Sequence, residues 1–295
     1  GLTGVHDLDG ARALRAWQVL RERGQLGLRV VKSIPASLAG RAVELGLRSG
    51  LGDDWLRLGG VKLFADGALG PKTAWMEAPY EGEPGNCGMP LGSREELERA
   101  VLAAAGAGLA CYIHAIGDRA NREVLEILAR ARAEEPGGAR LRHRIEHVQV
   151  LRPEDLPRLA ELGVIASMQP IHATSDMEIA DRHWGARVSG AYACRSLLQR
   201  GTSLAFGSDA PVEPIDPLLG IHAAVTRCRE DGTPGAAGWQ PQERLTVAEA
   251  VRAYTLGAAF AGGSVKDLPS APDSVATPGE GESERAPDPS AGYQA

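Results

Sequence analysis

Seven short apolar segments recur along the chain, and a segment with helical spacing of its apolar residues follows each of them, directly or after a loop. The predicted strands cover residues 2–5, 28–34, 60–67, 109–114, 141–150, 164–169 and 202–209. Strands that alternate with helices predict a parallel sheet joined by right-handed crossovers. Two architectures satisfy this pattern, the doubly wound sheet and the (β/α)₈ barrel.

Polar residues at the ends of the predicted strands distinguish the two architectures. They are His6, Lys62, His114, His147 and Asp209. In a barrel all of these strand ends open on one face, where active sites are built. A glycine-rich phosphate-binding motif, GxGxxG or GxxxxGK[ST], does not follow the first strand, which disfavours a nucleotide-binding sheet. We therefore predict an α/β fold of the TIM-type (β/α)₈ class.

The length of 295 residues and the even spread of the pattern favour one barrel domain over residues 1–261. Residues 262–295 are rich in Pro, Gly, Ser and Glu and lack apolar spacing, which predicts a disordered tail. The four cysteines have no CxxC spacing, so free thiols are expected.

Charge and hydropathy exclude two classes of partner. A formal net charge of -6 argues against a nucleic-acid or anionic-membrane surface. No run of 18 apolar residues is present, so no segment is expected to span a bilayer. We expect a cytoplasmic protein without nucleic-acid or membrane partners, and we consider a homodimer as its assembly.

Lys62 interrupts an apolar strand in the segment GVKLFADG, residues 60–67. Alternation along a strand sends Lys62, Phe64 and Asp66 to one face. A buried ammonium is costly, and a buried lysine responds with a lowered pKa and a nucleophilic amine. Such an amine can form a Schiff base with a carbonyl, or take up carbon dioxide as a carbamate that bridges two metal ions. The structural alternative is a lysine that reaches the strand end and pairs with Asp66.

His114, His147, Lys62 and Asp209 should converge at one end of the barrel. Neutral imidazoles and carboxylates are ligands that zinc, iron and manganese accept. A single histidine is more often a satisfied polar residue, but the coincidence of two at strand ends favours a metal site. For His143 and His183 we keep the structural interpretation.

Five segments together resemble amidohydrolase family 3, a branch of the metal-dependent amidohydrolase superfamily that includes the N-substituted formamide deformylases. They are VKLFADGALG (61–70), HAIGD (114–118), RIEH (144–147), MQPIH (168–172) and FGSDAPV (206–212). The resemblance extends from residue 2 to about residue 261, in the right order and at sensible spacings.

The resemblance implies a deformylase-like hydrolase of carbon–nitrogen bonds in small-molecule amides. By this likeness Lys62 becomes a carbamate that bridges two metal ions, and His114 and His147 bind the second metal. Asp209 binds the first metal and acts as the catalytic proton shuttle. The implied cofactors are one or two divalent ions, with zinc expected, and carbon dioxide. His172, Tyr112 and His6 would face the substrate.

The chain departs from the family pattern in three ways. No HxH pair is present, seven strands are predicted where a closed barrel has eight, and the small β-sandwich built from both termini is absent. We therefore expect a chain truncated at both ends, with impaired activity, in which Lys62, His114 and His147 still hold one metal. Two other classes stay open: a non-catalytic scaffold, and an aldolase that forms a Schiff base on Lys62.

Overall fold

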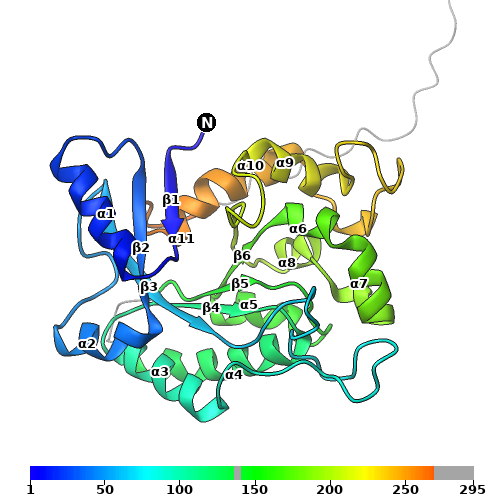
Figure 1. The fold of residues 1–295 in the computed structure, drawn as a ribbon, viewed down its shortest axis with the longest axis horizontal. Helices are drawn as coiled ribbons and strands as arrows, with labels where there is room; N and C mark the ends of the chain where they lie inside the picture. Colours follow the sequence, from blue (N-terminus) through cyan, green and yellow to red (C-terminus); the bar gives the residue numbers. More distant parts are fainter. Residues whose placement is uncertain (136–140, 269–295) are drawn as a thin grey trace, which may run out of the picture.

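Seven strands form a single parallel sheet in the computed structural model, which describes residues 1–135 and 141–268. Each strand pairs in parallel with the next one along the chain (Figure 1). The strands are β1 (Gly4–Asp7), β2 (Arg29–Pro35), β3 (Leu56–Phe64), β4 (Cys111–Ala115), β5 (Arg144–His147), β6 (Ile165–Met168) and β7 (Leu204–Phe206). This sequential parallel order confirms the predicted TIM-type fold class. Within the described ranges β7 does not pair with β1, so these two strands are the edges of the sheet.

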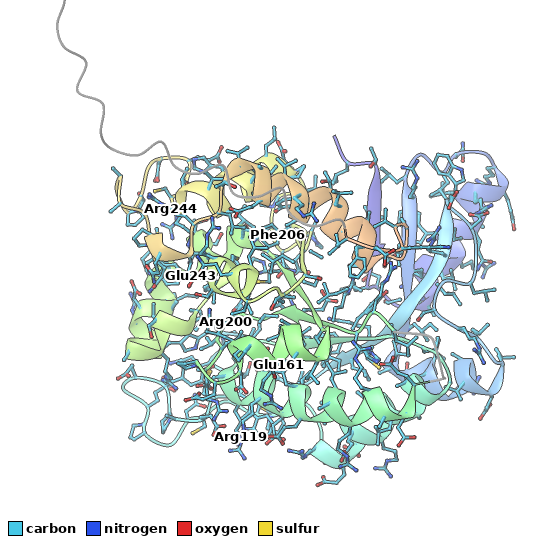
Figure 2. All side chains as sticks on the ribbon, turned by 180° about the vertical axis from the view of Figure 1, so that it is seen from behind. Arg119, Glu161, Arg200, Phe206, Glu243 and Arg244 are labelled. Atoms are coloured by element: carbon cyan, nitrogen blue, oxygen red, sulfur yellow. The ribbon has the colours of Figure 1, made fainter. Side chains whose placement is uncertain are left out.

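Helices connect the strands, and most lie where apolar spacing predicts them. They are α1 (Ala11–Glu22), η1 (Ala36–Leu38), α2 (Ala39–Glu44), α3 (Arg94–Gly106), α4 (Asp118–Glu134), α5 (Leu156–Leu162), α6 (Pro170–Ser175), α7 (Met177–Trp184), η2 (Gly185–Gly190), α8 (Cys194–Gln199), α9 (Pro217–Thr226), η3 (Pro241–Glu243), α10 (Val247–Arg252), η4 (Ala253–Gly257) and α11 (Ala258–Ala261). Figure 2 labels Arg119, Glu161 and Arg200, which are exposed residues of this helical layer and its turns.

One helix start was predicted from its capping residues, and one predicted loop is wrong. Ser93, followed by Glu96 three residues later, predicts a capping box, and the two side chains form it at the start of α3. The polar residues His172, Asp176 and His183 predict a loop between β6 and α8, but this segment contains α6, α7 and η2. Met177, Ala180 and Trp184 are buried on one face of α7, a helical spacing that the polar residues between them obscure.

Alternation along the strands divides apolar from polar side chains. Ile113 of β4 and Ile145 of β5 are fully buried and belong to one cluster with Val124 and Leu128 of α4. The residues that alternate with these isoleucines along each strand, such as His114 of β4, therefore point to the opposite, inner face of the curled sheet. The inner face is where the predicted site residues of β3, β4 and β5 lie.

The C-terminal helical segment lies beside edge strand β7 and reaches β1. The ring of Tyr254 in η4 packs on Phe206 of β7 with centroids 5.5 Å apart. Gly257 approaches β7 so closely that a Cβ would lie 2.0 Å from the Leu204 carbonyl oxygen. A Cβ on Gly262 would lie 2.6 Å from Nε2 of His6 in β1. The chain after Gly257 therefore runs between the two sheet edges (Figure 1).

Other expectations of the sequence can be compared with this fold. All four cysteines are free, as predicted, and Cys111 is buried in the core. No helix in the described part of the chain has the length and apolar character needed to cross a bilayer. The predicted disordered tail begins at residue 262, and its residues 269–295 lie outside the described residues. For that part the disorder stays a prediction.

Candidate metal centre

Side chains from three strands and one helix meet at the end of the inner face. The imidazoles of His114 and His147 are 4.5 Å apart between centroids, and those of His147 and His172 are 5.9 Å apart. Nζ of Lys62 lies 4.6 Å from the ring centroid of Phe64, which lies 5.3 Å from that of His114. The Lys62 charge also contributes to lowering the pKa of both His114 and His147. The structure thus brings together the lysine and the histidines predicted from separate strand ends.

Within the described part of the chain, hydrogen bonds occupy one nitrogen of each of the two central imidazoles and leave the other nitrogen free. Nε2 of His114 donates to the carbonyl oxygen of Gly67 at 2.8 Å, and Nδ1 of His147 donates to Oε1 of Gln169 at 2.8 Å. Nδ1 of His114 and Nε2 of His147 therefore carry lone pairs. Metal-ligating histidines are oriented in this way, with the outer ring nitrogen bound to an oxygen.

Burial keeps these imidazoles neutral. Desolvation lowers the pKa of His114 to about 4 and that of His147 well below its usual value. Desolvation also lowers the pKa of His172 to about 4, and its Nε2 is buried without a hydrogen-bond partner among the described residues. A neutral imidazole is the form that binds a metal. The three histidines are thus in the protonation state that a metal or substrate site needs near pH 7.

Lys62 is buried without a counter-ion in contact. It is 6% exposed, and its side-chain amine makes no hydrogen bond or salt bridge to any residue within 1–135 and 141–268. Burial lowers its pKa, while the nearby charges of Glu146 and Asp209 act in the opposite direction. The alternative pairing with Asp66 is wrong, because the Asp66 carboxylate accepts the backbone N–H groups of Trp75, Ile116 and Gly117 instead.

Left-handed backbone conformations aim two of the predicted ligands. Alternation along β5 would turn His147 away from the inner face, but its φ of 76° brings the ring to His114 and His172. Asp209, after β7, has a φ of 58° and is partly buried. Burial raises the pKa of Asp209, and the charge of Lys62 lowers it. Non-glycine residues in this region are strained and cluster at functional sites.

The donor set fits a metal only if Lys62 takes part. Among the described residues no three His, Cys, Asp or Glu side chains converge closely enough to hold an ion by themselves. The free nitrogens of His114 and His147 supply two donors. A carbamate on the unpaired Lys62 amine would supply oxygen donors beside them, and this nitrogen–oxygen set suits zinc.

Family membership follows from comparison with known proteins. The model of the group described as Amidohydrolase family matches residues 1–266. The chain belongs to the amidohydrolase family. This confirms the predicted family resemblance, which five short segments carried.

Several relatives of this amidohydrolase-family chain are longer than it is. Protein LONG AFTER FAR-RED 3 of Arabidopsis thaliana is 36% identical over 237 residues, covering 79% of this chain and 40% of that protein. Putative amidohydrolase YtcJ of Bacillus subtilis is 34% identical over 266 residues, covering 88% of this chain and 49% of that protein. N-substituted formamide deformylase of Arthrobacter pascens is 28% identical over 210 residues, covering 70% and 37%. The chain thus spans half or less of the length of these relatives.

A solved structure supports the same fold. An uncharacterised metal-dependent hydrolase from Pyrococcus horikoshii superimposes with a TM-score of 0.76 at 32% sequence identity. The match covers 88% of this amidohydrolase-family chain and 50% of that structure. The parallel TIM-type arrangement described above is therefore shared with a solved member of this class.

Tyr112 and His6 of this amidohydrolase-family chain both contact Arg144 of β5. Tyr112 precedes His114 by two residues on β4, and the Arg144 guanidinium lies 3.7 Å from its ring centroid. Nη1 of Arg144 also lies 2.7 Å from Nδ1 of His6. Both residues thus have Arg144 as an internal partner, and their predicted contacts with substrate stay predictions, as does that of His172.

The sequence did not indicate the roles of three residues around the centre. Glu146 is 2% exposed and its charge acts on Lys62, and its position two residues after Arg144 on β5 could have placed it on the inner face. Gln169 fixes His147, and Asp66 fixes the loop after β3 rather than Lys62. No sequence signal identifies these last two partners, because each contact joins distant segments.

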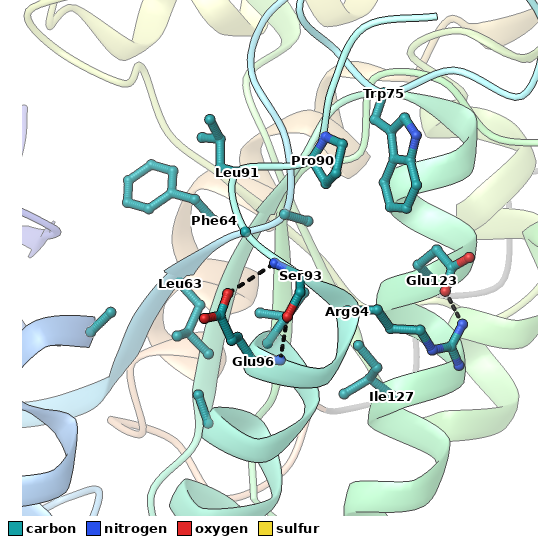
Figure 3. A pocket seen from close by; sticks show the side chains of 15 residues that line it. Leu63, Phe64, Trp75, Pro90, Leu91, Ser93, Arg94, Glu96, Glu123 and Ile127 are labelled. Atoms are coloured by element: carbon teal, nitrogen blue, oxygen red, sulfur yellow. Dashed lines mark hydrogen bonds and ion pairs between the residues drawn. The ribbon is translucent and has the colours of Figure 1, made fainter.

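A cavity of about 290 Å³ lies beside the centre and not within it. Apolar side chains of β3, α3 and α4, among them Leu63 and Ile127, line it together with Trp75 (Figure 3). Lys62, His114 and His147 are not among its lining residues. Phe64 and Leu91 border it at the end of β3, and both are about half exposed, at 49% and 54%.

Proposed function

We propose that this chain is a metal-dependent hydrolase of carbon–nitrogen bonds in linear amides such as N-substituted formamides. One observation carries the proposal: two neutral imidazoles present free nitrogens beside a buried lysine that no counter-ion of the described residues contacts. Membership of the amidohydrolase family supports hydrolysis. A relative named N-substituted formamide deformylase supports the substrate class. Because the chain spans about half of its relatives, its activity and substrate are proposals for the chain itself.

Lys62 would supply the oxygen donors of the centre. Carbon dioxide adds to its neutral amine, a nitrogen–carbon bond forms, and one proton is released, which leaves a carbamate. Burial favours the neutral amine that this step needs. Asp209, His114 and His147 would complete the ligand set, with zinc as the expected ion. A bound divalent ion lowers the pKa of a water molecule and polarises an amide carbonyl.

Proton transfer and substrate orientation fall to residues around Lys62. Asp209 would accept the proton of the attacking water and deliver it to the leaving nitrogen. Its raised pKa suits it to hold that proton between the two events. His172 would donate from its unpartnered Nε2 to the substrate carbonyl oxygen, since its Nδ1 lies 3.4 Å from the Nε2 amide group of Gln149.

The test is metal content together with amidase activity of the purified full chain. We expect bound zinc and slow hydrolysis of an N-alkylformamide, with both lost after dialysis against a chelator and restored by zinc. His147→Ala should lose both, whereas His222→Ala, which changes an exposed histidine of α9, should keep them. Turnover that is unchanged after chelation would refute the proposal. Two tightly bound ions with fast turnover would refute the expected impairment instead.

A Schiff-base enzyme is the second candidate, because the unpaired amine of Lys62 would serve it equally well. Borohydride would then trap a carbonyl compound on Lys62, and chelators would have no effect. A non-catalytic scaffold predicts neither trapping nor chelator-sensitive hydrolysis. The two measurements therefore separate all three functions.

A further inference from the structure

Phe64 connects the proposed centre to the solvent. The centroid of its ring lies 4.6 Å from Nζ of Lys62 and 5.3 Å from the ring centroid of His114. The side chain is nevertheless 49% exposed. A group seated against the exposed part of this ring would lie close to the proposed metal ligands, because the same ring neighbours Lys62 and His114. A single exposed apolar residue is common, but a contiguous exposed apolar surface marks a binding site.

Leu91 extends this apolar surface from a neighbouring segment. It is 54% exposed, and it borders the same cavity as Phe64 (Figure 3). Its backbone N–H donates to the carbonyl oxygen of Ala65 at 3.0 Å, so the loop is fastened to the end of β3. We call Phe64 and Leu91 the apolar lip. Because the lip is the edge of a hollow, its surface is not flat.

The lip is held in place before any ligand arrives. Asp66 follows Ala65, and Pro90 precedes Leu91. Asp66 and Pro90 form an antiparallel bridge. The Asp66 carboxylate accepts the backbone N–H groups of Ile116 and Gly117 at 3.0 and 2.8 Å, which ties this bridge to the end of β4. Preorganisation of this kind lowers the entropic cost of binding.

We propose that the apolar lip binds a hydrophobic substituent of the amide substrate, so that the chain prefers amides with an alkyl or aryl group over amides with a charged group of the same length. This inference rests on the proposed function. Continuity with the centre supports the choice of occupant, since Phe64 contacts both Lys62 and His114. A charged substituent would lose hydration against the two apolar side chains of the lip. Arg94, the cationic residue of the cavity lining, is already paired with Glu123 and Glu126.

The first test compares N-pentylformamide with N-(4-carboxybutyl)formamide on the zinc-loaded full chain. We expect kcat/KM to favour the pentyl compound about tenfold or more, the range that apolar contacts give. Leu91→Ala and Phe64→Leu should each reduce this preference severalfold. The control is Leu45→Ala, which removes a leucine that is 76% exposed and follows α2, before β3 begins. An unchanged preference in both lip variants would overturn the inference and leave the proposed hydrolysis standing.

The second test measures binding without hydrolysis. Calorimetry of the chelator-treated full chain with N-pentylacetamide should give an affinity that Leu91→Ala weakens severalfold and Leu45→Ala does not. If no formamide is hydrolysed but this binding persists, the proposed function fails and the lip stands as a binding surface. Absence of binding overturns the lip. Sedimentation supplies the remaining outcome: a dimer that Leu91→Asp dissociates would assign the lip to a second copy of the chain, against the inference.

Discussion

Nε of Arg144 lies 2.5 Å from Oε1 of Glu146 on the inner face of β5, with both residues at most 2% exposed. The same guanidinium contacts His6 of β1 and the ring of Tyr112 in β4. Arg144 therefore links three strands across the interior of an open sheet. Glu146 supplies its negative partner, and the charge of Glu146 also acts on Lys62.

Glu146→Gln should destabilise the fold strongly. The change leaves the buried Arg144 without a carboxylate, and breaking one side of a buried ion pair costs about 3–5 kcal/mol. The free energy of unfolding from urea titration measures this loss. Glu22→Gln, which changes an exposed carboxylate at the end of α1, is the matched control and should change stability by less than about 0.5 kcal/mol. Equal effects of the two substitutions would contradict the assigned role of the pair.

Lys62→Arg should remove metal binding that depends on bicarbonate. Arginine keeps a positive charge but cannot form a carbamate, so the oxygen donors of the centre are lost. We expect at least about a hundredfold loss of metal affinity or turnover, more than removal of an outer ligand partner costs. Metal analysis with and without bicarbonate, and the carbamate signal in carbon-13 NMR, check this. Lys72→Arg, at the loop lysine paired with Glu83, should behave like the native chain. A carbamate signal that survives in Lys62→Arg would contradict the assignment.

Stability should fall as the pH drops from about 6.5 towards 4. Burial and the Arg144 charge lower the pKa of His6 to about 3, and burial lowers that of His172 to about 4. Below pH 6.5 these histidines are protonated in the unfolded chain but stay neutral in the folded chain. The free energy of unfolding therefore decreases by up to about 1.4 kcal/mol per pH unit for each such histidine.

Urea titrations across this pH range measure the effect of each histidine as a difference. His172→Asn should reduce the slope of stability against pH between 6.5 and 4. His222→Asn, at an exposed position on α9, should leave the slope unchanged. Identical slopes in the two variants would show that His172 does not carry the effect.

Asp66→Ala should release the loop between β3 and α3. The carboxylate of Asp66 is fully buried and accepts three backbone N–H groups, from Trp75, Ile116 and Gly117. Each buried N–H left without a partner costs about 1–3 kcal/mol. Hydrogen exchange and limited proteolysis should report faster opening over residues 67–92. Asp54→Ala, at a highly exposed aspartate, serves as the control. A loop that stays protected in Asp66→Ala would show that other contacts hold it.

Local patterns in the sequence determined the fold class. Alternating apolar segments predicted seven strands and their parallel order, because strand and helix periodicity depend on neighbouring residues. The capping box of Ser93 and Glu96 is similarly local and was predicted. The pattern failed between β6 and α8, where polar residues hide the buried face of α7. The family resemblance was also readable in the chain alone.

Tertiary structure alone decided how the centre is oriented. The sequence places His147 at a strand end, but its left-handed backbone and its bond to Gln169 turn the ring towards His114. The sequence suggests Asp66 as a partner for Lys62, but the Asp66 carboxylate accepts hydrogen bonds from backbone N–H groups of two other segments. These outcomes depend on atoms that are distant in the chain and meet only after folding, so no local periodicity encodes them.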